Sequence, residues 1–376
     1  MKSILIGILS PFPVSAISIN KEELTHCVEL AHRHGVEMLF YSRLKKLYAG
    51  SNACIDNYLK KNESAYRHAV VKSISQEVIE NQIIAALGKQ DIPACIIKGN
   101  EIARTIYEDP NCRSSADIDV LVKNSDVVKA DLIMRTAHFK PANDISLCYF
   151  ILHQQHAVYR ESVYNNLIEL HWNFGIPYFF RLSSEEIWKE VIVGEGGHMQ
   201  LTPEMLLISL LIHHHNHSFS EMKILIDLLW TLKKYDQIIN WPDFSVRLKK
   251  IGLTRVTMIS ICQIEDLWPT DASRIHSIKM LKQILIDMDY SVSKYLTSYF
   301  RMNLEGTSEL SLMDKIVGRF ALDGLDMIFL SYLKTIFPPP EAIHELFHTA
   351  GNLTLPIDYL RFICWRIKRW AGFAKI

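Results

Sequence analysis

The segment Ala116–Val122 constrains the fold more than any other part of this 376-residue chain. Its sequence, Ala-Asp-Ile-Asp-Val-Leu-Val, alternates acidic with apolar and β-branched residues, which is the period-2 pattern of a strand. Side chains two residues apart on a strand point to the same face. Asp117 and Asp119 are therefore predicted to project together, while Ile118 and Val120 enter a core. The chain must build a sheet that buries one face and presents two carboxylates on the other.

Short strand and helix patterns surround this segment. Residues 92–97 (Ile-Pro-Ala-Cys-Ile-Ile) and the segments His156–Arg160 and Leu167–His171 are predicted to be strands. Helices are expected from Glu101 to about Tyr107 and from Ser125 to His138. The order strand, helix, strand, helix, strand, strand predicts a small mixed sheet with helices packed against it.

Helical periodicity dominates the rest of the chain. Asn20 and Glu23 predict a capping box, and a long helix is expected from Tyr66 to Lys89. That helix has a broad apolar face made of Val70, Val71, Ile74, Val78, Ile79, Ile83, Ile84 and Leu87. After about Ser183 the chain is expected to return to helices, among them Pro203–His217, Ser220–Tyr235 and Pro242–Ile251, with several beyond.

The fold class predicted from these patterns is α+β, with a small mixed β-sheet core embedded in a mainly α-helical protein. Pro338-Pro339-Pro340 separates a terminal piece from the helices before it. Four regions are predicted: an N-terminal helical region (1–90), an α/β core (91–182), a helical domain that completes a cleft (183–337) and a C-terminal helical extension (338–376).

Charge and composition narrow the partners. The 41 basic and 41 acidic residues cancel, so the broad positive field of a non-specific nucleic-acid binder is excluded and long nucleic acid is disfavoured. Seven scattered cysteines without a C-x-x-C pair indicate a reduced, cytoplasmic protein. No apolar run is long enough for a transmembrane segment. The basic, amphipathic segment Tyr359–Trp370 is interpreted as a docked terminal helix, with peripheral membrane contact as the alternative.

Three acids and a glycine turn carry the chemistry. Two adjacent carboxylates repel each other, and a cation between Asp117 and Asp119 relieves the repulsion; oxygen ligands suit Mg²⁺ or Mn²⁺. Glu169, between apolar neighbours on a predicted strand, is a third acid that needs a cation or an opening to solvent. At Lys98-Gly99-Asn100 a strand turns into a helix, where glycine lets the backbone approach a phosphate and Lys98 adds positive charge. Such a set suits two-metal phosphoryl or nucleotidyl transfer.

With Gly99, Asp117-Ile118-Asp119 and Glu169, the chain resembles the DNA polymerase β-type nucleotidyltransferase superfamily. More narrowly, it resembles an uncharacterised bacterial nucleotidyltransferase family over residues 1 to about 250. The matching residues are Lys98-Gly99, Arg113, Asp117-Ile118-Asp119, Glu169-Leu170-His171-Trp172, and the helical set His213, His217, Lys223 and Asp227. The chain departs from the superfamily at Asn100, where serine is usual, and at Glu169, where aspartate is commoner.

The resemblance implies a Mg²⁺-dependent nucleotidyltransferase, a phosphorus-group transferase. It would move a nucleoside monophosphate from an NTP to a hydroxyl or phosphate of an unidentified small-molecule, peptide or protein acceptor, and release pyrophosphate. Asp117, Asp119 and Glu169 would be the catalytic and metal-binding residues, with Glu169 also helping to accept the hydroxyl proton. The nucleotide-binding residues would be Lys98, Gly99, Asn100, Arg113, His217 and Lys223, with Asp227 orienting Lys223.

Alternatives stay open. The D-x-D pattern also occurs in nucleotide-sugar glycosyltransferases, although these normally have a larger α/β region before it, and the chain could be a non-catalytic helical binding module. His213 and His217 could bind zinc, line the cleft or be structural, and Lys223 and Asp227 could form a simple surface pair. The preferred hypothesis requires that Glu169 point toward the two aspartates and that no permanent lysine or arginine occupy them.

Overall fold

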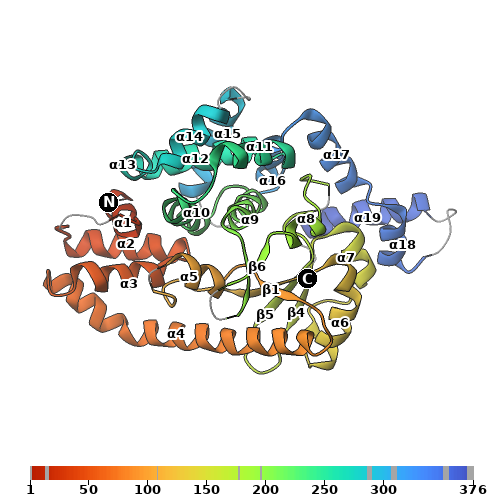
Figure 1. Ribbon diagram of the computed structural model, residues 1–376, viewed down its shortest axis with the longest axis horizontal. Helices are drawn as coiled ribbons and strands as arrows, with labels where there is room; N and C mark the ends of the chain where they lie inside the picture. Colours follow the sequence, from red (N-terminus) through yellow and green to blue (C-terminus); the bar gives the residue numbers. More distant parts are fainter. Residues whose placement is uncertain are drawn as a thin grey trace.

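The computed structural model describes residues 2–12, 17–107, 109–176, 178–194, 197–285, 290–305, 311–349 and 355–370. The protein has an α+β fold, as the sequence predicts. A small sheet lies between the long helix α4 (Ala53–Gly88) and a layer of helices from the second half of the chain (Figure 1). The domain boundaries drawn from the sequence remain a prediction.

The sheet has five strands in the order β1-β2-β5-β4-β3. Their bounds are β1 Ala94–Ile96, β2 Asp117–Val122, β3 Lys140–Pro141, β4 His156–Arg160 and β5 Leu167–His171. Strands β2 and β5 are parallel, and the other neighbours are antiparallel. The register places Asp119 beside Glu169 and His156 beside His171, so polar side chains from three strands share one face.

The other face of the sheet is apolar. Ile118 and Val120, at 1% and 0% exposed, pack with residues of α4 and of α6 (Val127–Thr136), which confirms their predicted place in the core. Ile168 and Leu170 of β5 join the same cluster. Because neighbouring residues on a strand alternate between faces, this burial fixes Asp117, Asp119 and Glu169 on the opposite face.

Helix α4 differs from its prediction at its start and in its burial. It begins at Ala53, capped by Asn52, rather than at Tyr66. Of the predicted apolar face only Ile79, Ile83 and Leu87 are buried, whereas the exposed members are Val71 (62%), Ile74 (52%) and Val78 (51%). The helix runs along the edge of the molecule, so neighbours cover only one side of it (Figure 1).

The N-terminal helices precede α4 and pack beside it. Asn20 and Glu23 form the predicted capping box, each side chain accepting a hydrogen bond of 2.9 Å from the backbone N–H of the other. The remaining elements before the helical half are α1 (Lys2–Leu9), α2 (Lys21–Arg33), α3 (Glu37–Tyr48), α5 (Asn100–Ile106), η1 (Asn124–Asp126), α7 (Leu147–His153) and α8 (Ser184–Trp188).

The region after Ser183 is mainly helical but also contains two short strands that the sequence did not predict. A hairpin of β6 (Val191–Val193) and β7 (Met199–Leu201) precedes the helices, and β7 contacts β1. The segments are too short for their periodicity to distinguish strand from loop. The helices that follow are α9 (Pro203–Asn216), α10 (Met222–Tyr235), α11 (Trp241–Ile251), α12 (Thr254–Leu267), α13 (Pro269–Ala272), α14 (His276–Leu285), α15 (Tyr290–Glu305), α16 (Leu312–Gly318) with η2 (Arg319–Ala321), α17 (Leu325–Ile336), α18 (Pro340–Phe347) and α19 (Leu355–Trp370).

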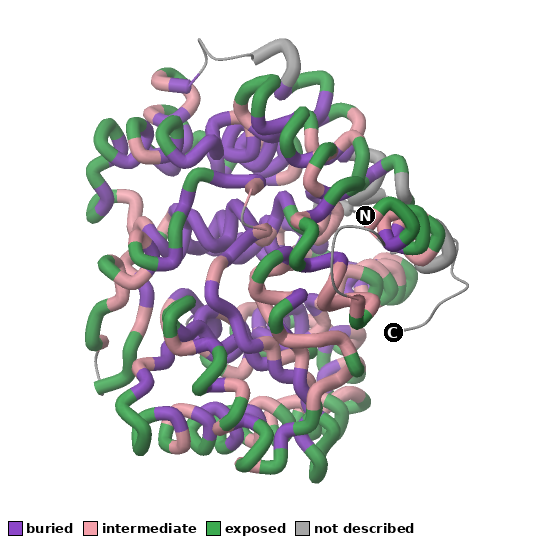
Figure 2. Tube along the Cα trace, turned by 90° about the vertical axis from the view of Figure 1, so that its right-hand side faces the viewer, coloured by how far each residue is buried: buried purple, intermediate pink, exposed green. Residues whose placement is uncertain are grey.

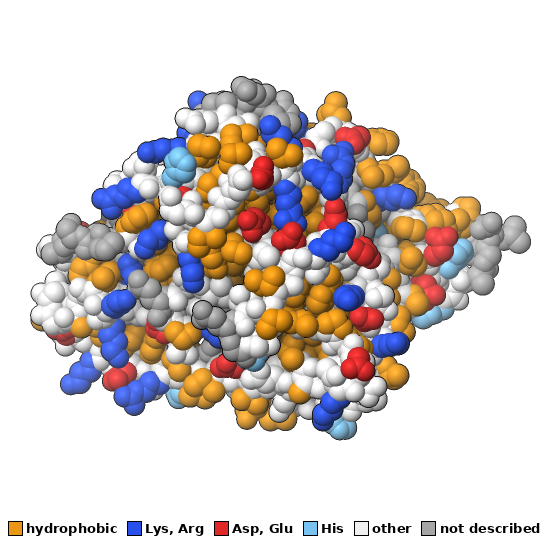
Figure 3. Space-filling view, viewed as in Figure 1, with side chains coloured by type: hydrophobic (Ala, Val, Ile, Leu, Met, Phe, Trp, Pro, Cys, Tyr) orange, Lys and Arg blue, Asp and Glu red, His pale blue; other side chains and the backbone are white. Residues whose placement is uncertain are grey.

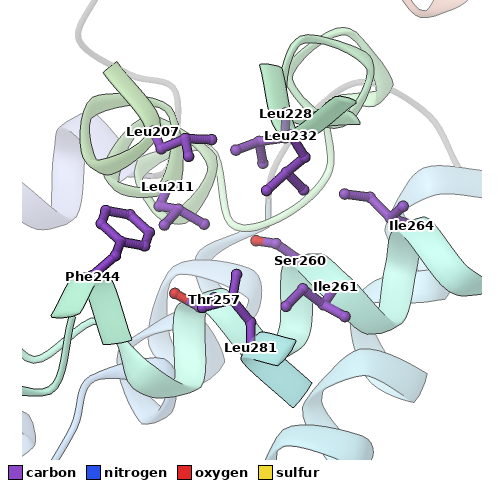
Figure 4. Close-up of a pocket in the computed structure, with 10 residues that line it drawn as sticks. All are labelled: Leu207, Leu211, Leu228, Leu232, Phe244, Thr257, Ser260, Ile261, Ile264 and Leu281. Carbon is purple, nitrogen blue, oxygen red and sulfur yellow. The ribbon is translucent and has the colours of Figure 1, made fainter. Parts of the chain in front are cut away.

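Helices α9 and α10 form the centre of this half, and most of their residues are buried. Buried residues concentrate in the interior of the molecule, and exposed ones lie along its outline (Figure 2). Between them, α11, α12 and α14 lies a cavity of only about 20 Å³ (Figure 4). Its walls are mainly leucine and isoleucine, and the hydroxyls of Thr257 and Ser260 donate to backbone carbonyls. The cavity is therefore a small packing defect and not a binding site.

The face of the molecule drawn in Figure 3 carries both basic and acidic side chains, in keeping with a net charge of zero. None of the helices in the described ranges combines the length and the apolar character that crossing a bilayer demands. Residues 367–370, at the end of the basic C-terminal segment, have side chains outside the described part of the chain.

Candidate active site

The open face of the sheet gathers five ionisable side chains. Asp117 and Asp119 come from β2, Glu169 and His171 from β5, and His156 from β4. Each pair on one strand is two residues apart and so shares a face, and the register brings the three strands' residues side by side. The local period-2 pattern and the parallel pairing of β2 with β5 are together what create the site.

Asp119 lies at the centre and is paired with a lysine and a histidine. The Lys98 Nζ atom donates to Asp119 Oδ1 at 2.7 Å, and His171 Nε2 lies 2.9 Å from the same oxygen. Asp119 is 2% exposed. Burial by itself raises the pKa of the Asp119 carboxyl, but Lys98 and His171 outweigh burial and hold that pKa well below its usual range. Asp119 is therefore ionised in the folded protein.

Glu169 converges on the same place through the histidines. His171 Nε2 lies 3.0 Å from Glu169 Oε2, and His156 Nε2 lies 3.7 Å from Glu169 Oε1. Burial raises the pKa of Glu169, yet its bond with His171 and the nearby His156 lower it to about 2. Such a carboxylate is suited to holding a cation and is a weak proton acceptor.

Asp117 lies close to the carboxylates of Asp119 and Glu169 and is repelled by their negative charges. Its Oδ1 atom accepts a hydrogen bond of 3.2 Å from Ser115 Oγ. Burial, followed by the charges of Asp119 and Glu169, raises the pKa of Asp117. A further cation placed among the three carboxylates would remove this repulsion.

These residues fit a divalent cation. The carboxylates of Asp117, Asp119 and Glu169 are the oxygen donors that Mg²⁺ and Mn²⁺ prefer, and the Lys98 ammonium already marks a cation position among them. His156, Glu169 and His171 form a second, mixed donor set, whose ligand atoms all lie within 4.8 Å of one another. Imidazole nitrogen shifts the preference of that set toward Mn²⁺, Fe²⁺ or Zn²⁺.

The two conditions placed on the hypothesis have different outcomes. Glu169 does point toward Asp119, and His171 bridges their side chains. The aspartates are not free of lysine, however, because Lys98 is bound to Asp119 instead of standing ready for a phosphate. A cation that uses this Asp119 oxygen must compete with the Lys98 ammonium.

The turn at Gly99 lies next to this face, but Asn100 points away from it. Gly99 has a φ of +59°, and a Cβ atom there would approach Ser115 Oγ to 3.2 Å. The Asn100 amide donates to Glu80 Oε1 at 2.9 Å and to the Ser73 carbonyl at 3.2 Å. The Asn100 side chain is thus hydrogen-bonded to α4, and its contact with a phosphate stays a prediction.

Arg113 and Asp227 form a buried ion pair with each other. The Arg113 Nη2 atom lies 2.8 Å from Asp227 Oδ2, and Tyr107 donates to Asp227 Oδ1 at 2.6 Å. The side chains of Arg113 and Asp227 are 5% and 0% exposed. Asp227 therefore pairs with Arg113 and not with Lys223, and the contact of Arg113 with a phosphate or acceptor stays a prediction. The pair instead ties the loop before β2 to α10.

Lys223 and the histidine-rich helix border the site to different degrees. Lys223 Nζ lies 3.4 Å from the Ser114 carbonyl, and burial followed by Arg113 lowers the Lys223 pKa. Burial also lowers the pKa of His213 far below its usual range, and Lys98 lies near enough to add to the effect. His217 binds Glu221 at the end of α9, with 2.5 Å between Nδ1 and Oε1. His213 therefore borders the site, whereas His217 has a partner of its own.

Sequence reasoning missed His156 and the role of His171. The signal for His171 was present, because it lies two residues after Glu169 on the same strand. His156 starts a predicted strand, but only the pairing of β4 with β5 brings it opposite His171. Nothing in the local sequence around His156 reveals that pairing.

A small mixed sheet with clustered carboxylates beside a glycine turn, set among helices, defines a transferase of the nucleotidyltransferase class. The family model described as "Uncharacterised nucleotidyltransferase" matches residues 20–269. The chain belongs to this family, and an NTP is accordingly its implied substrate. Comparisons with curated proteins and with solved structures find no match.

Proposed function

We propose that the protein is a divalent-metal-dependent nucleotidyltransferase of the DNA polymerase β type, which transfers a nucleoside monophosphate from an NTP to an acceptor hydroxyl or phosphate. The convergence of Asp117, Asp119 and Glu169 on one face of the sheet, beside the Gly99 turn, is the observation that supports this proposal. Two Mg²⁺ or Mn²⁺ ions bound there would neutralise the triphosphate and lower the pKa of the attacking hydroxyl.

The proposed reaction exchanges one phosphorus–oxygen bond for another. The acceptor oxygen attacks the α-phosphorus of the NTP, the bond from the α-phosphorus to the bridging oxygen breaks, and pyrophosphate leaves. The acceptor proton passes to water, since the low pKa of Glu169 makes its carboxylate a weak base. Asp117, Asp119 and Glu169 are the residues that would hold the cations, and the cations would supply the charge that stabilises the triphosphate.

Lys98 and Lys223 have complementary parts in this proposal. Lys98 neutralises Asp119 in the structure, and a divalent cation bound to Asp119 would release it. Its ammonium, adjacent to Gly99, then becomes available to the β- and γ-phosphates. Lys223, whose Nζ donates to the Ser114 backbone carbonyl at 3.4 Å, would supply a second positive charge.

The test is pyrophosphate release from labelled NTPs with Mg²⁺ or Mn²⁺, first with the protein alone to detect self-modification and then with cell extract. We expect Asp117→Asn and Asp119→Asn to lower turnover at least about 100-fold, since each carboxylate would bind the metal directly. Asp326→Asn, at an ion pair on the surface, is the matched control and should retain full turnover. Unchanged Mg²⁺-dependent NTP binding and turnover in both active-site variants would reject the proposal.

A further inference from the structure

A large cleft opens from the acidic site toward the C-terminal helices. Its volume is about 780 Å³, within the range of small-molecule binding sites. Glu169 and His156 stand at one end, and the walls come from β4, α7, the end of α9, α16, η2 and α19. Several of these elements lie toward the right in Figure 1.

The cleft lies on the acceptor side of Glu169. Lys98, Gly99 and Lys223, to which the proposed function gives the triphosphate, are not among the described residues that line it. Glu169 is shared by the cleft and the carboxylate cluster. A molecule in the cleft would therefore approach the reacting phosphorus from the side opposite the Gly99 turn.

The charge of the lining is strongly one-sided. Arg160, Lys315, Arg319 and Arg366 line the cleft, and Glu169 is the one acidic side chain among its described lining residues. Arg319 stacks over the rings of Tyr332 and Phe179, at 4.8 and 5.4 Å, and forms no ion pair with a described carboxylate. A guanidinium held rigidly by aromatic rings, without a carboxylate, is well suited to an anionic ligand.

His215 provides an independent sign of a ligand. It lines the cleft, is 5% exposed, and neither of its ring nitrogens has a hydrogen-bond partner of normal geometry among the described residues. Burial lowers the pKa of His215 to about 4, with a smaller opposing effect from the nearby Asn216 side chain and Gly318 backbone. These two groups lie near the ring without forming hydrogen bonds of normal geometry, so the buried imidazole is poorly satisfied and a polar ligand in the cleft would complete its hydrogen bonding.

Resting on the proposed function, we infer that this cleft binds the acceptor, and that the acceptor is a small anion bearing a phosphate or carboxylate group. The anionic group would lie against Arg319 and Lys315. The aromatic wall of Tyr149, Phe150 and Phe179 would cover an apolar or ring-shaped remainder of the molecule. The acceptor would thus be a small molecule, and not a long nucleic acid.

The preference of the cleft for anions can be tested by calorimetry with three small phenyl compounds. Phenyl phosphate, benzoate and the uncharged phenol are each titrated into the full chain without NTP or metal. We expect saturable binding of phenyl phosphate or benzoate and none of phenol. Arg319→Met should weaken the binding about tenfold or more, because a desolvated charge-assisted contact is lost, and Arg319→Lys should restore part of it. Arg181→Met, at an exposed arginine outside the cleft, is the matched control and should bind as wild type.

A second variant, Lys315→Ser, covers the case in which the Arg319 variants fail to fold. Lys315 is exposed, so its replacement should lower the affinity for the anion without changing the stability of the protein. Equal binding of phenol, no binding of any probe, or anion binding that neither Arg319→Met nor Lys315→Ser weakens would overturn the inference. A different outcome would be anion binding that depends on Arg319 together with no pyrophosphate release with any acceptor. That outcome would contradict the proposed function, and the acceptor role of the cleft with it. In an active protein, Arg319→Met should raise the acceptor KM and leave the NTP KM unchanged.

Discussion

Replacing Asp227 by asparagine is the sharpest test of how this structure is held together. Asp227 is fully buried and accepts hydrogen bonds from Arg113 Nε at 3.0 Å, from Arg113 Nη2 at 2.8 Å and from the Tyr107 hydroxyl at 2.6 Å. Asparagine keeps the shape but removes the charge, so the Arg113 guanidinium stays buried without its counter-ion. Breaking a buried pair in this way costs about 3–5 kcal/mol.

Urea unfolding of wild type and Asp227→Asn at one pH gives the difference in unfolding free energy. The control is Asp326→Asn, which breaks an exposed pair with Arg181 and should cost less than about 1 kcal/mol. The double variant Arg113→Met/Asp227→Leu should recover much of the loss, because apolar replacements of a buried pair are often near neutral. A loss in Asp227→Asn no larger than that of the control would refute the reasoning.

NTP binding by the same variants tests whether Arg113 serves only the stability of the fold or also contacts the nucleotide, as predicted. In the structure Arg113 reaches the site only through a 3.4 Å contact from Nη1 to the Gly99 carbonyl. The stable double variant should therefore bind NTP within about threefold of wild type, a difference of well under 1.4 kcal/mol. A tenfold or greater loss with stability restored would show that the guanidinium contacts the nucleotide, as the sequence suggested.

Three further outcomes follow from the groups around the Gly99 turn. Burial raises the pKa of Glu80 to about 7, so the stabilising contribution of its protonated form is complete below about pH 4.5 and is lost as pH rises through 7. In urea unfolding, the stability of Glu80→Gln relative to wild type should rise by roughly 3 kcal/mol between pH 4.5 and pH 8. A difference that stays constant with pH would contradict this. Lys98→Met should bind Mn²⁺ roughly tenfold more tightly by calorimetry without nucleotide, since it removes the competing ammonium, and weaker binding would speak against competition. Gly99→Ala should destabilise by about 1–3 kcal/mol in urea because of its φ of +59°, whereas Gly88→Ala, in open space on α4, should not.

The strands of the core could be predicted closely because their pattern is local. Alternation of acidic and apolar residues placed the segment that became β2, and the predicted limits of β4 and β5 coincide with those of the structure. The same period-2 rule put Asp117 and Asp119 on one face. The β6–β7 hairpin was missed because three-residue strands carry too little periodicity to be recognised.

The ion-pair partners of the charged side chains could not be predicted, because they come from parts of the chain that are distant in sequence and meet only in the fold. Lys98 and Arg113 lie in one short region, yet one pairs with Asp119, 21 residues away, and the other with Asp227, 114 residues away. Local sequence describes Arg113 as a loop arginine and Asp227 as a helix residue four places after Lys223. Only the packing of α10 against the loop before β2 shows that they neutralise each other.

This division of the basic residues limits what the site can do. Arg113 is committed to Asp227, and the Lys98 ammonium offsets one of the three negative charges of Asp117, Asp119 and Glu169. His171 offsets a second charge when its imidazole is protonated, and its raised pKa favours that form. The carboxylates therefore keep an excess of negative charge, and the site gains by exchanging its ammonium for a divalent ion. Lys98 is 14% exposed and sits on a flexible stem, whereas His171 is fixed within a strand. We therefore expect the divalent ion to displace Lys98 and not His171. The displaced ammonium would then lie nearer to the triphosphate of the proposed function.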